Sequence, residues 1–399
     1  MKLNRFFKLL LVLCVLVLIV ADVLHIPGNS PEPAETAPAT EPAETVPTET
    51  EPPAEAGPGI TVDGDVLASG SLLFEDELYV NAREFLTALD RGNWSGDDAE
   101  GFLLEWENRV YQISPERETV LVDHQAIALF QPVRCYRDEI WLPLDELCTM
   151  LNISLFEDPE EDHIYCTSGI LIDRIPGNIR VPVLMYHAVD SQTWGHRELF
   201  VTPEVMEQHI RYLLDNGYDP IFFEDLPNLS EYDKPVIITF DDGYRNNYTE
   251  LYPLLQKYQV KATIFIVTSS IGNKETSMTP EQVKELSDSG LVSIQSHTVN
   301  HRVLRGLSAE EQRMEMEQSK LLVTRMTGRE PFVISYPTGV YDENTLVSAK
   351  EFYRFGVIVL RGDYITGTDP WTIRRYNVRD TTTMEDLALM LCDAGEPGR

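Results

Sequence analysis

The sequence predicts an α/β protein whose larger part is a distorted (β/α) barrel. After about residue 170, short apolar runs rich in Val, Ile and Phe alternate with amphipathic segments that have helix-capping residues. About seven such units follow one another, which favours a closed or partly closed barrel over an open sheet. Ahead of them, a small α/β region and an acidic Pro-rich stretch indicate separate parts.

The helices of the barrel are predicted from their first and last residues. TPEVMEQHIRYLLDNG has Thr202 at the cap, Pro203 in the first turn and Gly217 at its end. The same pattern recurs in TPEQVKELSDSG, and Ser308 and Glu311 stand at capping-box spacing. The predicted strands are VPVLMY, PVIITF, KATIFIV, LVSIQ, PFVIS and FGVIVL. Their continuous apolar character is typical of a mainly parallel sheet covered by helices.

The first residues have the features of an export signal. Lys2, Arg5 and Lys8 precede an apolar run over residues 9–21, which is short for a membrane span. Extended to residue 26, the run could remain as an anchor, so residues 1–26 are either a cleaved signal peptide or a signal anchor. Both alternatives predict an exported protein of the cell envelope or the exterior, and residues 9–26 would contact the membrane.

Residues 27–59 predict a disordered linker. They consist mostly of Pro, Glu, Thr and Ala and contain no Lys, Arg or aromatic residue. Such a composition cannot bury enough apolar surface to offset the entropy of ordering. The net charge of the chain is −33, and this shortage of cations argues against nucleic acid as a partner.

Residues 60–170 predict a small α/β domain with an internal repeat. ELYVNAREFLTALD, from Glu77, and EIWLPLDELCTMLN, from Glu139, both read as a short strand that runs into a helix. The pattern resembles the amino-terminal stalk-like domain first named from copper amine oxidases. The matched apolar positions are expected to be buried: Leu78, Val80, Phe85 and Leu89 with Ile140, Leu142, Leu147 and Leu151.

The histidines and cysteines of this region give little indication of a metal site or of a particular disulfide. His124 and His163 have no second histidine at ligand spacing, so neither copper nor another metal is expected there. Cys135, Cys148 and Cys166 could form one disulfide after export, and their spacing leaves the pairing open.

Polar residues follow several predicted barrel strands directly, where parallel strands place their reactive side chains. Asp241 and Asp242 follow PVIITF, and His297 and His301 follow LVSIQ. Two histidines at i and i+4 can lie on one face of a helical turn, and a carboxylate from another strand end completes a metal site. The plainer alternatives are a turn at the aspartates and two histidines that flank a loop.

Four motifs resemble the polysaccharide deacetylases with the NodB homology domain, carbohydrate esterase family four. They are VPVLMYHAV, TFDDGYRNNY, SHTVNH and SYPTG, and the resemblance covers about residues 180–383 within a predicted catalytic domain at 171–399. It implies metal-dependent removal of acetyl groups from N-acetylated sugars. It also implies that Asp241 is the general base and that Asp242, His297 and His301 hold the metal, with Zn2+ favoured and Co2+ or Ni2+ as alternatives.

The third motif departs from the pattern of that family. Ser335 stands where the family has an arginine, and Thr338 stands where it has a tyrosine whose backbone N–H binds the oxyanion. Thr338 can still supply that N–H. In WTIRRYNV, Arg375 is the candidate to orient Asp241, with Arg374 one step out of register.

The last motif of the family carries a histidine that protonates the leaving amine, but no histidine follows His301. His187, after the first barrel strand, is the candidate acid, ahead of His196 and His209. Three further residues at strand ends are predicted substrate contacts: Tyr186, Tyr336 and Pro337.

These residues predict a hydrolase that removes N-acetyl groups from a polysaccharide containing N-acetylglucosamine, such as peptidoglycan or a poly-N-acetylglucosamine, and releases acetate. Two alternatives remain open. An O-acetyl glycan esterase needs the same metal and water but less help for its leaving group. A glycan-binding wall protein with weakened catalysis would explain the altered third and last motifs, although it has no need of Asp241.

Overall fold

The computed structural model describes residues 55–89, 92–106, 109–115, 119–129, 131–169 and 174–392. The predicted signal or anchor at residues 1–26 and most of the predicted linker lie outside these residues. In the part of the chain that is described, no helix is long and apolar enough to cross a membrane.

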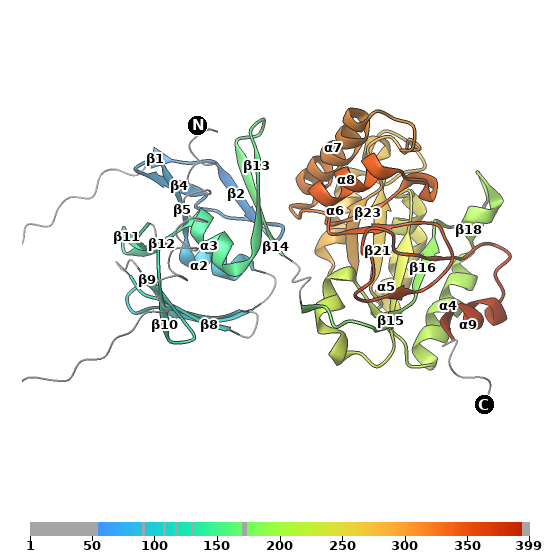
Figure 1. Ribbon diagram of the computed structural model, residues 1–399, viewed down its shortest axis with the longest axis horizontal. Coiled ribbons are helices and arrows are strands. Elements are labelled where there is room, and N and C mark those ends of the chain that lie inside the picture. Colours follow the sequence, from blue (N-terminus) through green and yellow to red (C-terminus); the bar gives the residue numbers. More distant parts are fainter. Residues whose placement is uncertain are drawn as a thin grey trace, which may run out of the picture. The chain divides into compact units, whose positions relative to one another are not determined.

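Residues 55–169 form three sheets and two short helices (Figure 1). The first sheet has the strand order β1-β4-β5-β12-β11, the second β10-β9-β8-β7-β6 and the third β13-β14-β2-β3. The strands are β1 (Glu55–Ala56), β2 (Gly59–Val62), β3 (Asp65–Val66), β4 (Ser71–Phe74), β5 (Glu77–Asn81), β6 (Asn93–Asp97), β7 (Gly101–Trp106), β8 (Arg109–Ile113), β9 (Thr119–Val122), β10 (Gln125–Ala128), β11 (Arg134–Tyr136), β12 (Glu139–Pro143), β13 (Ile153–Asp158) and β14 (His163–Ser168).

The two repeated segments have the predicted strand-to-helix form. Strand β5 runs into α2 (Ala82–Ala88), and β12 runs into α3 (Leu144–Leu151). The two strands are antiparallel neighbours, with Val80 opposite Leu142. The apolar positions matched between the copies are buried in one core, except Leu78, which is partly buried. The repeat is therefore a packing unit, because its matched residues fill a shared core.

The predicted disorder is wrong for the last residues of the linker. Glu55 and Ala56 pair with Leu73 and Leu72 of β4, and β2 begins at Gly59. Backbone pairing accounts for the difference, because a strand edge can order residues whose own side chains bury little apolar surface.

Residues 180–377 contribute the strands of the second part, in which one sheet of eight parallel strands has the order β24-β23-β22-β21-β20-β16-β26, with β19 also paired to β20. These strands are β16 (Val183–Tyr186), β19 (Asp219–Ile221), β20 (Pro235–Phe240), β21 (Ala262–Ile266), β22 (Val292–Ser296), β23 (Val333–Ser335), β24 (Phe355–Val357) and β26 (Tyr376–Asn377). Short pairs are formed by β15 (Arg180–Val181) with β25 (Tyr364–Ile365) and by β17 (Ala188–Val189) with β18 (Phe200–Val201). The sheet is a half-barrel, so the predicted distorted (β/α) barrel is confirmed in its partly closed form.

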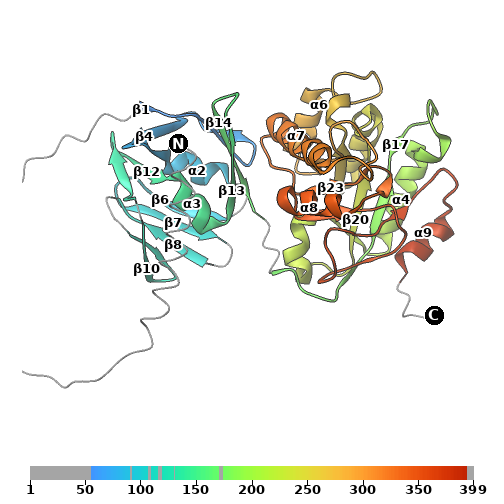
Figure 2. The same ribbon diagram turned by 45° about the horizontal axis from the view of Figure 1, so that its top comes forward.

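The helices of this part cover the sheet, as Figures 1 and 2 show for α6, α7 and α8. The α-helices are α4 (Pro203–Asp215), α5 (Tyr252–Tyr258), α6 (Pro280–Asp288), α7 (Ala309–Thr327), α8 (Glu343–Phe352) and α9 (Met384–Leu391). Short helical turns are η2 (Arg197–Leu199), η3 (Phe223–Glu231), η4 (Asn247–Leu251), η5 (Thr268–Ser270) and η6 (Pro337–Gly339). Although α4 and α9 lie far apart in the sequence, they are side by side and share one core cluster.

The predicted helix starts are confirmed by hydrogen bonds. The side chain of Thr202 accepts from the N–H of Val205, and Ser308 and Glu311 form the expected capping box at the start of α7. A second capping box opens α6.

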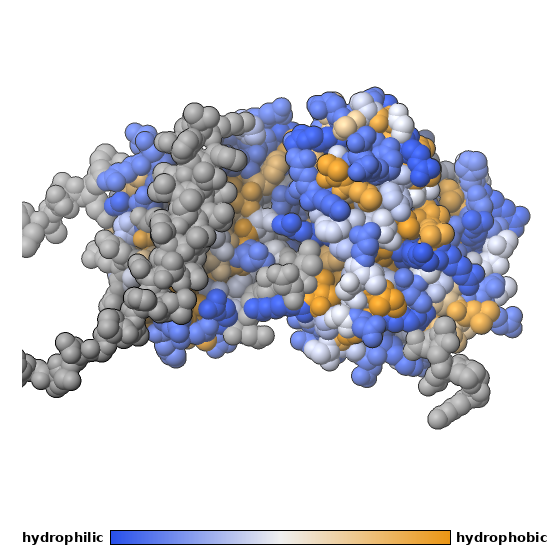
Figure 3. Space-filling model, in the orientation of Figure 1, coloured by the Kyte–Doolittle hydropathy of each residue, from blue (hydrophilic) through white to orange (hydrophobic). Residues whose placement is uncertain are grey.

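Both faces of the parallel sheet are buried. Val236, Ile238 and Phe240 of β20 belong to one core cluster, while Ile237 of the same strand belongs to another, which also contains Phe265. A strand buried on both faces needs apolar residues at successive positions, and this requirement explains the continuous apolar runs. On the face that Figure 3 shows, the described surface is mostly hydrophilic, with separate apolar patches.

Candidate metal centre and active site

The carboxyl ends of two strands of the parallel sheet, with β21 between them, bring together three side chains that can hold a metal ion. Asp242 follows β20, while His297 and His301 follow β22. Oδ1 of Asp242 lies 3.6 Å from Nε2 of His297 and 3.5 Å from Nε2 of His301. All three ligand atoms lie within 4.8 Å of one another. Two imidazoles and one carboxylate are a donor set that suits zinc and leaves coordination positions open.

The buried ring of His297 is oriented for a metal. Its Nδ1 lies 2.7 Å from the backbone oxygen of Ser335, so Nδ1 carries the proton and donates it to that carbonyl. Burial lowers the pKa of His297, which keeps the imidazole neutral. Its Nε2 lone pair therefore faces Asp242, and the residues present fit a divalent cation.

The two histidines lie on a loop and not on the predicted helical turn. Thr298 and His301 have left-handed backbone conformations, with φ of 66° and 55°, and the ring centroids of the two histidines are 4.7 Å apart. Glu315 of α7 holds this loop by accepting from the backbone N–H groups of Val299 at 3.0 Å and Asn300 at 2.8 Å. The sequence offers no signal for Glu315, because its partners are backbone groups of a distant segment.

Asp242 and Gly243 turn the chain away from β20 through two successive left-handed residues, with φ of 76° and 69°. A Cβ at position 243 would lie 2.9 Å from Cγ2 of Ile266, at the end of the neighbouring strand. The turn therefore needs glycine for both its conformation and its space.

Asp241 forms a fully buried ion pair beside the three candidate ligands. Nη1 of Arg375 lies 2.7 Å from Oδ1 of Asp241, and Nη2 lies 2.8 Å from Oδ2. Burial by itself would raise the pKa of Asp241, but the charge and hydrogen bonds of Arg375 hold it well below its ordinary value. Oδ2 of Asp241 is also 3.9 Å from Nε2 of His297, so an ionised carboxylate borders the candidate metal centre.

Ser335 completes the support of Asp241. Its hydroxyl donates to Oδ2 of Asp241 at 3.2 Å and accepts from Nη2 of Arg375 at 3.0 Å. The small side chain at position 335 thus leaves room for the guanidinium that comes from position 375.

His187 is close enough to the site to interact with the charges of Asp241 and Asp242. Its Nδ1 is buried and has no hydrogen-bond partner among the described residues. Burial lowers the pKa of His187 more strongly than the two carboxylates raise it. The ring is therefore neutral in this arrangement.

The structure places all three predicted substrate contacts in the core. The Tyr186 side chain is buried against Phe240, with its hydroxyl 3.1 Å from Nδ1 of His209, and the Tyr336 hydroxyl donates to the backbone oxygen of Trp371 at 3.0 Å. Pro337 is buried as well. These side chains pack into the core because alternate residues at a strand end point to opposite faces.

The remaining predicted residues differ in exposure. Thr338 is exposed and has a left-handed backbone, with φ of 60°. Among the weaker histidines, His196 is exposed, and His209 lies in the core, where burial lowers its pKa to about 4.

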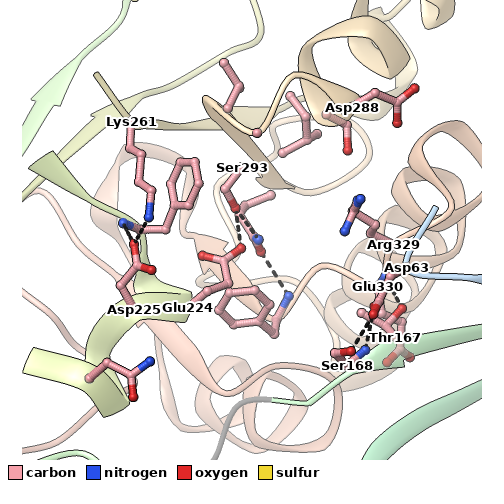
Figure 4. A pocket seen from close by; sticks show the side chains of 18 residues that line it. Asp63, Thr167, Ser168, Glu224, Asp225, Lys261, Asp288, Ser293, Arg329 and Glu330 are labelled. Atoms are coloured by element: carbon pink, nitrogen blue, oxygen red, sulfur yellow. Dashed lines mark hydrogen bonds and ion pairs between the residues drawn. The ribbon is translucent and has the colours of Figure 1, made fainter. Parts of the chain in front are cut away.

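Figure 4 draws a separate pocket, and polar groups of residues 224–293 in its lining are paired with one another. Lys261 forms an ion pair with Asp225 at 2.8 Å, and the Ser293 hydroxyl donates to Glu224 at 2.7 Å. Lys261 precedes β21, so this network lies at the amino ends of the strands, away from the metal ligands.

Comparison with known proteins identifies the class of this domain. Residues 229–354 match the family model described as polysaccharide deacetylase. The predicted deacetylase domain is therefore confirmed over this segment, which includes the two aspartates and the two histidines of the site.

Three individual proteins are similar to this chain. YxkH of Bacillus subtilis (strain 168), named as a candidate polysaccharide deacetylase, is 42% identical over 184 residues, which are 45% of this chain and 64% of that protein. The poly-beta-1,6-N-acetyl-D-glucosamine N-deacetylase of Escherichia coli (strain K12) is 29% identical over 136 residues, 29% of this chain and 20% of that protein. The chain thus spans less than two thirds of the length of either relative.

The third is a solved structure, the Streptococcus pyogenes deacetylase PplD in complex with acetate. It is 27% identical, with a TM-score of 0.51, and the match covers 54% of this chain and 100% of that one.

Proposed function

We propose that this protein is a metal-dependent hydrolase that removes N-acetyl groups from a polysaccharide containing N-acetylglucosamine and releases acetate. The observation that carries the proposal is the placement of Asp241. Its carboxylate is buried, ionised and held by Arg375, and it borders a cluster of three metal-ligating side chains. A protein that only held a metal would have no use for such a carboxylate.

Each residue of the site has a role in this proposal. Asp242, His297 and His301 would hold the divalent cation, which would supply Lewis acidity toward the acetamide carbonyl and the attacking water. Asp241 accepts the proton of that water, and Arg375 and Ser335 keep its carboxylate oriented. The backbone N–H of Thr338 stabilises the negative charge that develops on the carbonyl oxygen. His187 would transfer a proton to the departing nitrogen, and for this step its ring must first have taken up that proton as imidazolium.

The neutral state of His187 favours one alternative, an O-acetyl esterase. A neutral imidazole is a weaker proton donor than an imidazolium, and an alkoxide leaves with less protonation than an amine does. Wild-type acetate release from matched N-acetylated and O-acetylated sugar oligomers distinguishes the two activities. His187→Ala should lower release from the N-acetylated oligomer more strongly if the histidine acts as the acid.

The decisive experiment measures acetate release from an N-acetylglucosamine oligomer. We expect release by the wild type and its loss with a chelator or in Asp241→Asn. His124→Asn is the matched control, because His124 is exposed on a turn of residues 55–169 and asparagine tolerates its left-handed conformation. Unchanged release by Asp241→Asn would contradict the assignment of the base.

The setting of the enzyme is part of the proposal. Residues 1–26 would export the protein and could anchor it, and residues 27–54 would separate it from the membrane as an acidic linker. Residues 55–169, which resemble the copper amine oxidase stalk-like domain, would serve as a spacer. The substrate would then be an envelope glycan, such as peptidoglycan or the poly-N-acetylglucosamine named for the Escherichia coli relative.

A further inference from the structure

An exposed tryptophan lies next to the candidate active site. Trp194 is in the segment between β17 and β18, is 44% exposed and is the only exposed tryptophan among the residues that the structure describes. A tryptophan is usually mostly buried, because its ring has a large apolar surface. The exposure of this ring therefore suggests that the ring has a function at the surface.

The indole is held in place on two sides by other aromatic rings. Its centroid lies 4.9 Å from that of Phe200 and 5.0 Å from that of Tyr244, with the rings nearly perpendicular in both pairs. Its Nε1 donates to Oδ2 of Asp190 at 3.3 Å. An aromatic ring that is fixed before binding loses little conformational entropy when a ligand covers it.

The segment that carries Trp194 is also fastened to the chain that follows the two aspartates. Asn246 donates through Nδ2 to Oδ2 of Asp190 at 3.4 Å, and its Oδ1 accepts from the N–H of Val189 at 3.3 Å. The position of the indole is thus coupled to the position of the metal-ligating turn.

Tyr244 connects the indole to the metal centre. It lies two positions after Asp242, and its side chain has a hydrogen bond to the carboxylate of Asp242. Trp194, Tyr244 and Asp242 therefore form a continuous wall from an exposed aromatic surface to the metal ligands.

We propose that Trp194 is a stacking platform for a pyranose ring of the glycan chain, next to the sugar that loses its acetyl group. A pyranose presents C–H groups on its faces and hydroxyls around its edge, so it suits an exposed, rigid ring at the border of a polar site. The proposal rests on the proposed function for its substrate class. Trp194 is a positioning residue, since it would touch the chain of sugars and not the reacting atoms.

Its test measures binding separately from turnover. In an Asp241→Asn background, calorimetry should show that Trp194→Ala weakens the binding of an N-acetylglucosamine tetramer by roughly three- to tenfold, the range expected for one aromatic contact. Trp194→Phe should retain part of the affinity. Leu389→Ala, an exposed residue of α9, is the surface control and should bind as Asp241→Asn alone does. Equal affinity of Trp194→Ala and its parent would overturn the proposal.

Kinetics and metal content exclude a merely structural effect. In the otherwise wild-type protein, Trp194→Ala should raise KM for the tetramer with little change in kcat, and it should leave zinc content and the hydrolysis of a small acetyl ester without a sugar ring unchanged. A parallel loss of zinc would show that the indole supports Tyr244 and Asp242, and would also overturn the proposal. If the wild type binds the tetramer without releasing acetate, the proposed function fails while the role of Trp194 in binding is still measured.

Discussion

Arg375 forms two parallel hydrogen bonds to the carboxylate of Asp241, and neither side chain has appreciable contact with solvent. A bidentate pair of this kind fixes the orientation of the carboxylate as well as its charge. The arginine comes from position 375, and Ser335 stands at the position of the third motif where the resemblance to the deacetylase family leads us to expect an arginine. The proposed base and its partner are therefore both present, although the motif expected to supply the partner is altered.

Loss of Arg375 should be strongly destabilising. Arg375→Ala leaves a buried carboxylate without its charged partner, and we expect the free energy of unfolding to fall by about 3–5 kcal/mol, with a loss of acetate release. Chemical unfolding monitored by circular dichroism measures the first effect. The neighbouring Arg374 is exposed, so Arg374→Ala is the control and should change stability by less than about 0.5 kcal/mol. Similar stabilities of the two variants would refute the importance of the pair.

The low pKa of Asp241 predicts an acid-dependent stability. Because the folded carboxyl binds its proton less readily than the unfolded one, the contribution of Asp241 is complete above about pH 4, the ordinary pKa of an aspartate. It is lost as the pH falls toward the folded value. We expect the free energy of unfolding of the metal-free protein to fall more steeply with decreasing pH for the wild type than for Asp241→Asn. If the free energies of unfolding of the two proteins change in parallel with pH, the predicted lowering of the pKa of Asp241 is wrong.

The three metal ligands should act as a set. Asp242→Ala, His297→Ala and His301→Ala should each weaken zinc binding by at least roughly tenfold, since even outer-sphere changes cost 10- to 100-fold. Competition with a fluorescent zinc chelator measures this without reference to catalysis. His196→Ala serves as a control, because His196 is exposed and lies outside the cluster. Full zinc affinity in any of the three variants would remove that residue from the site.

A comparison of Gly243→Ala with Gly290→Ala separates the cost of backbone strain from the cost of steric contact. The added Cβ would meet Ile266, whereas at Gly290, which has the same φ of 69°, a Cβ would have nothing within 4 Å. Gly290→Ala should cost only the conformational term, roughly 1 kcal/mol. Gly243→Ala should cost more and also lower zinc affinity, because the turn positions Asp242. Thermal unfolding and zinc titration compare the two variants. Equal stability and equal zinc affinity would show that the contact between the added Cβ and Ile266 is relieved without effect.

The spacing of Cys135, Cys148 and Cys166 does not indicate which two could form a disulfide, and the structure favours Cys148 with Cys166. Sγ of Cys148, on α3, lies 3.9 Å from Sγ of Cys166, on β14, and both side chains are buried. During export, exchange with a dithiol–disulfide oxidoreductase would join the two sulfurs while the oxidant's disulfide takes up two protons and two electrons. Peptide mapping without reductant should recover the linked pair, and Cys148→Ser should abolish it. Recovery of alkylated Cys148 from exported protein would exclude the bond.

Much of the fold follows from local patterns. The helix caps at Thr202 and Ser308, the apolar strands and the strand-to-helix repeats are all formed by neighbouring residues, so the sequence predicts them. The loop at His297 and His301 could not be predicted as readily. Its left-handed residues are stabilised by Glu315 from a helix that comes later in the chain, and the i, i+4 spacing alone suggested a helical turn.

The sequence by itself determined the order of strands and helices, the class of the domain and the chemical types of the site residues, because periodicity and motif spacing are local properties. Tertiary structure alone decided which side chains meet. It placed Arg375 on Asp241, turned Tyr186 and Tyr336 into the core, and set Trp194 against Tyr244. These outcomes depend on the register of parallel strands and on the face to which each side chain points, and both are established only when distant segments pack together.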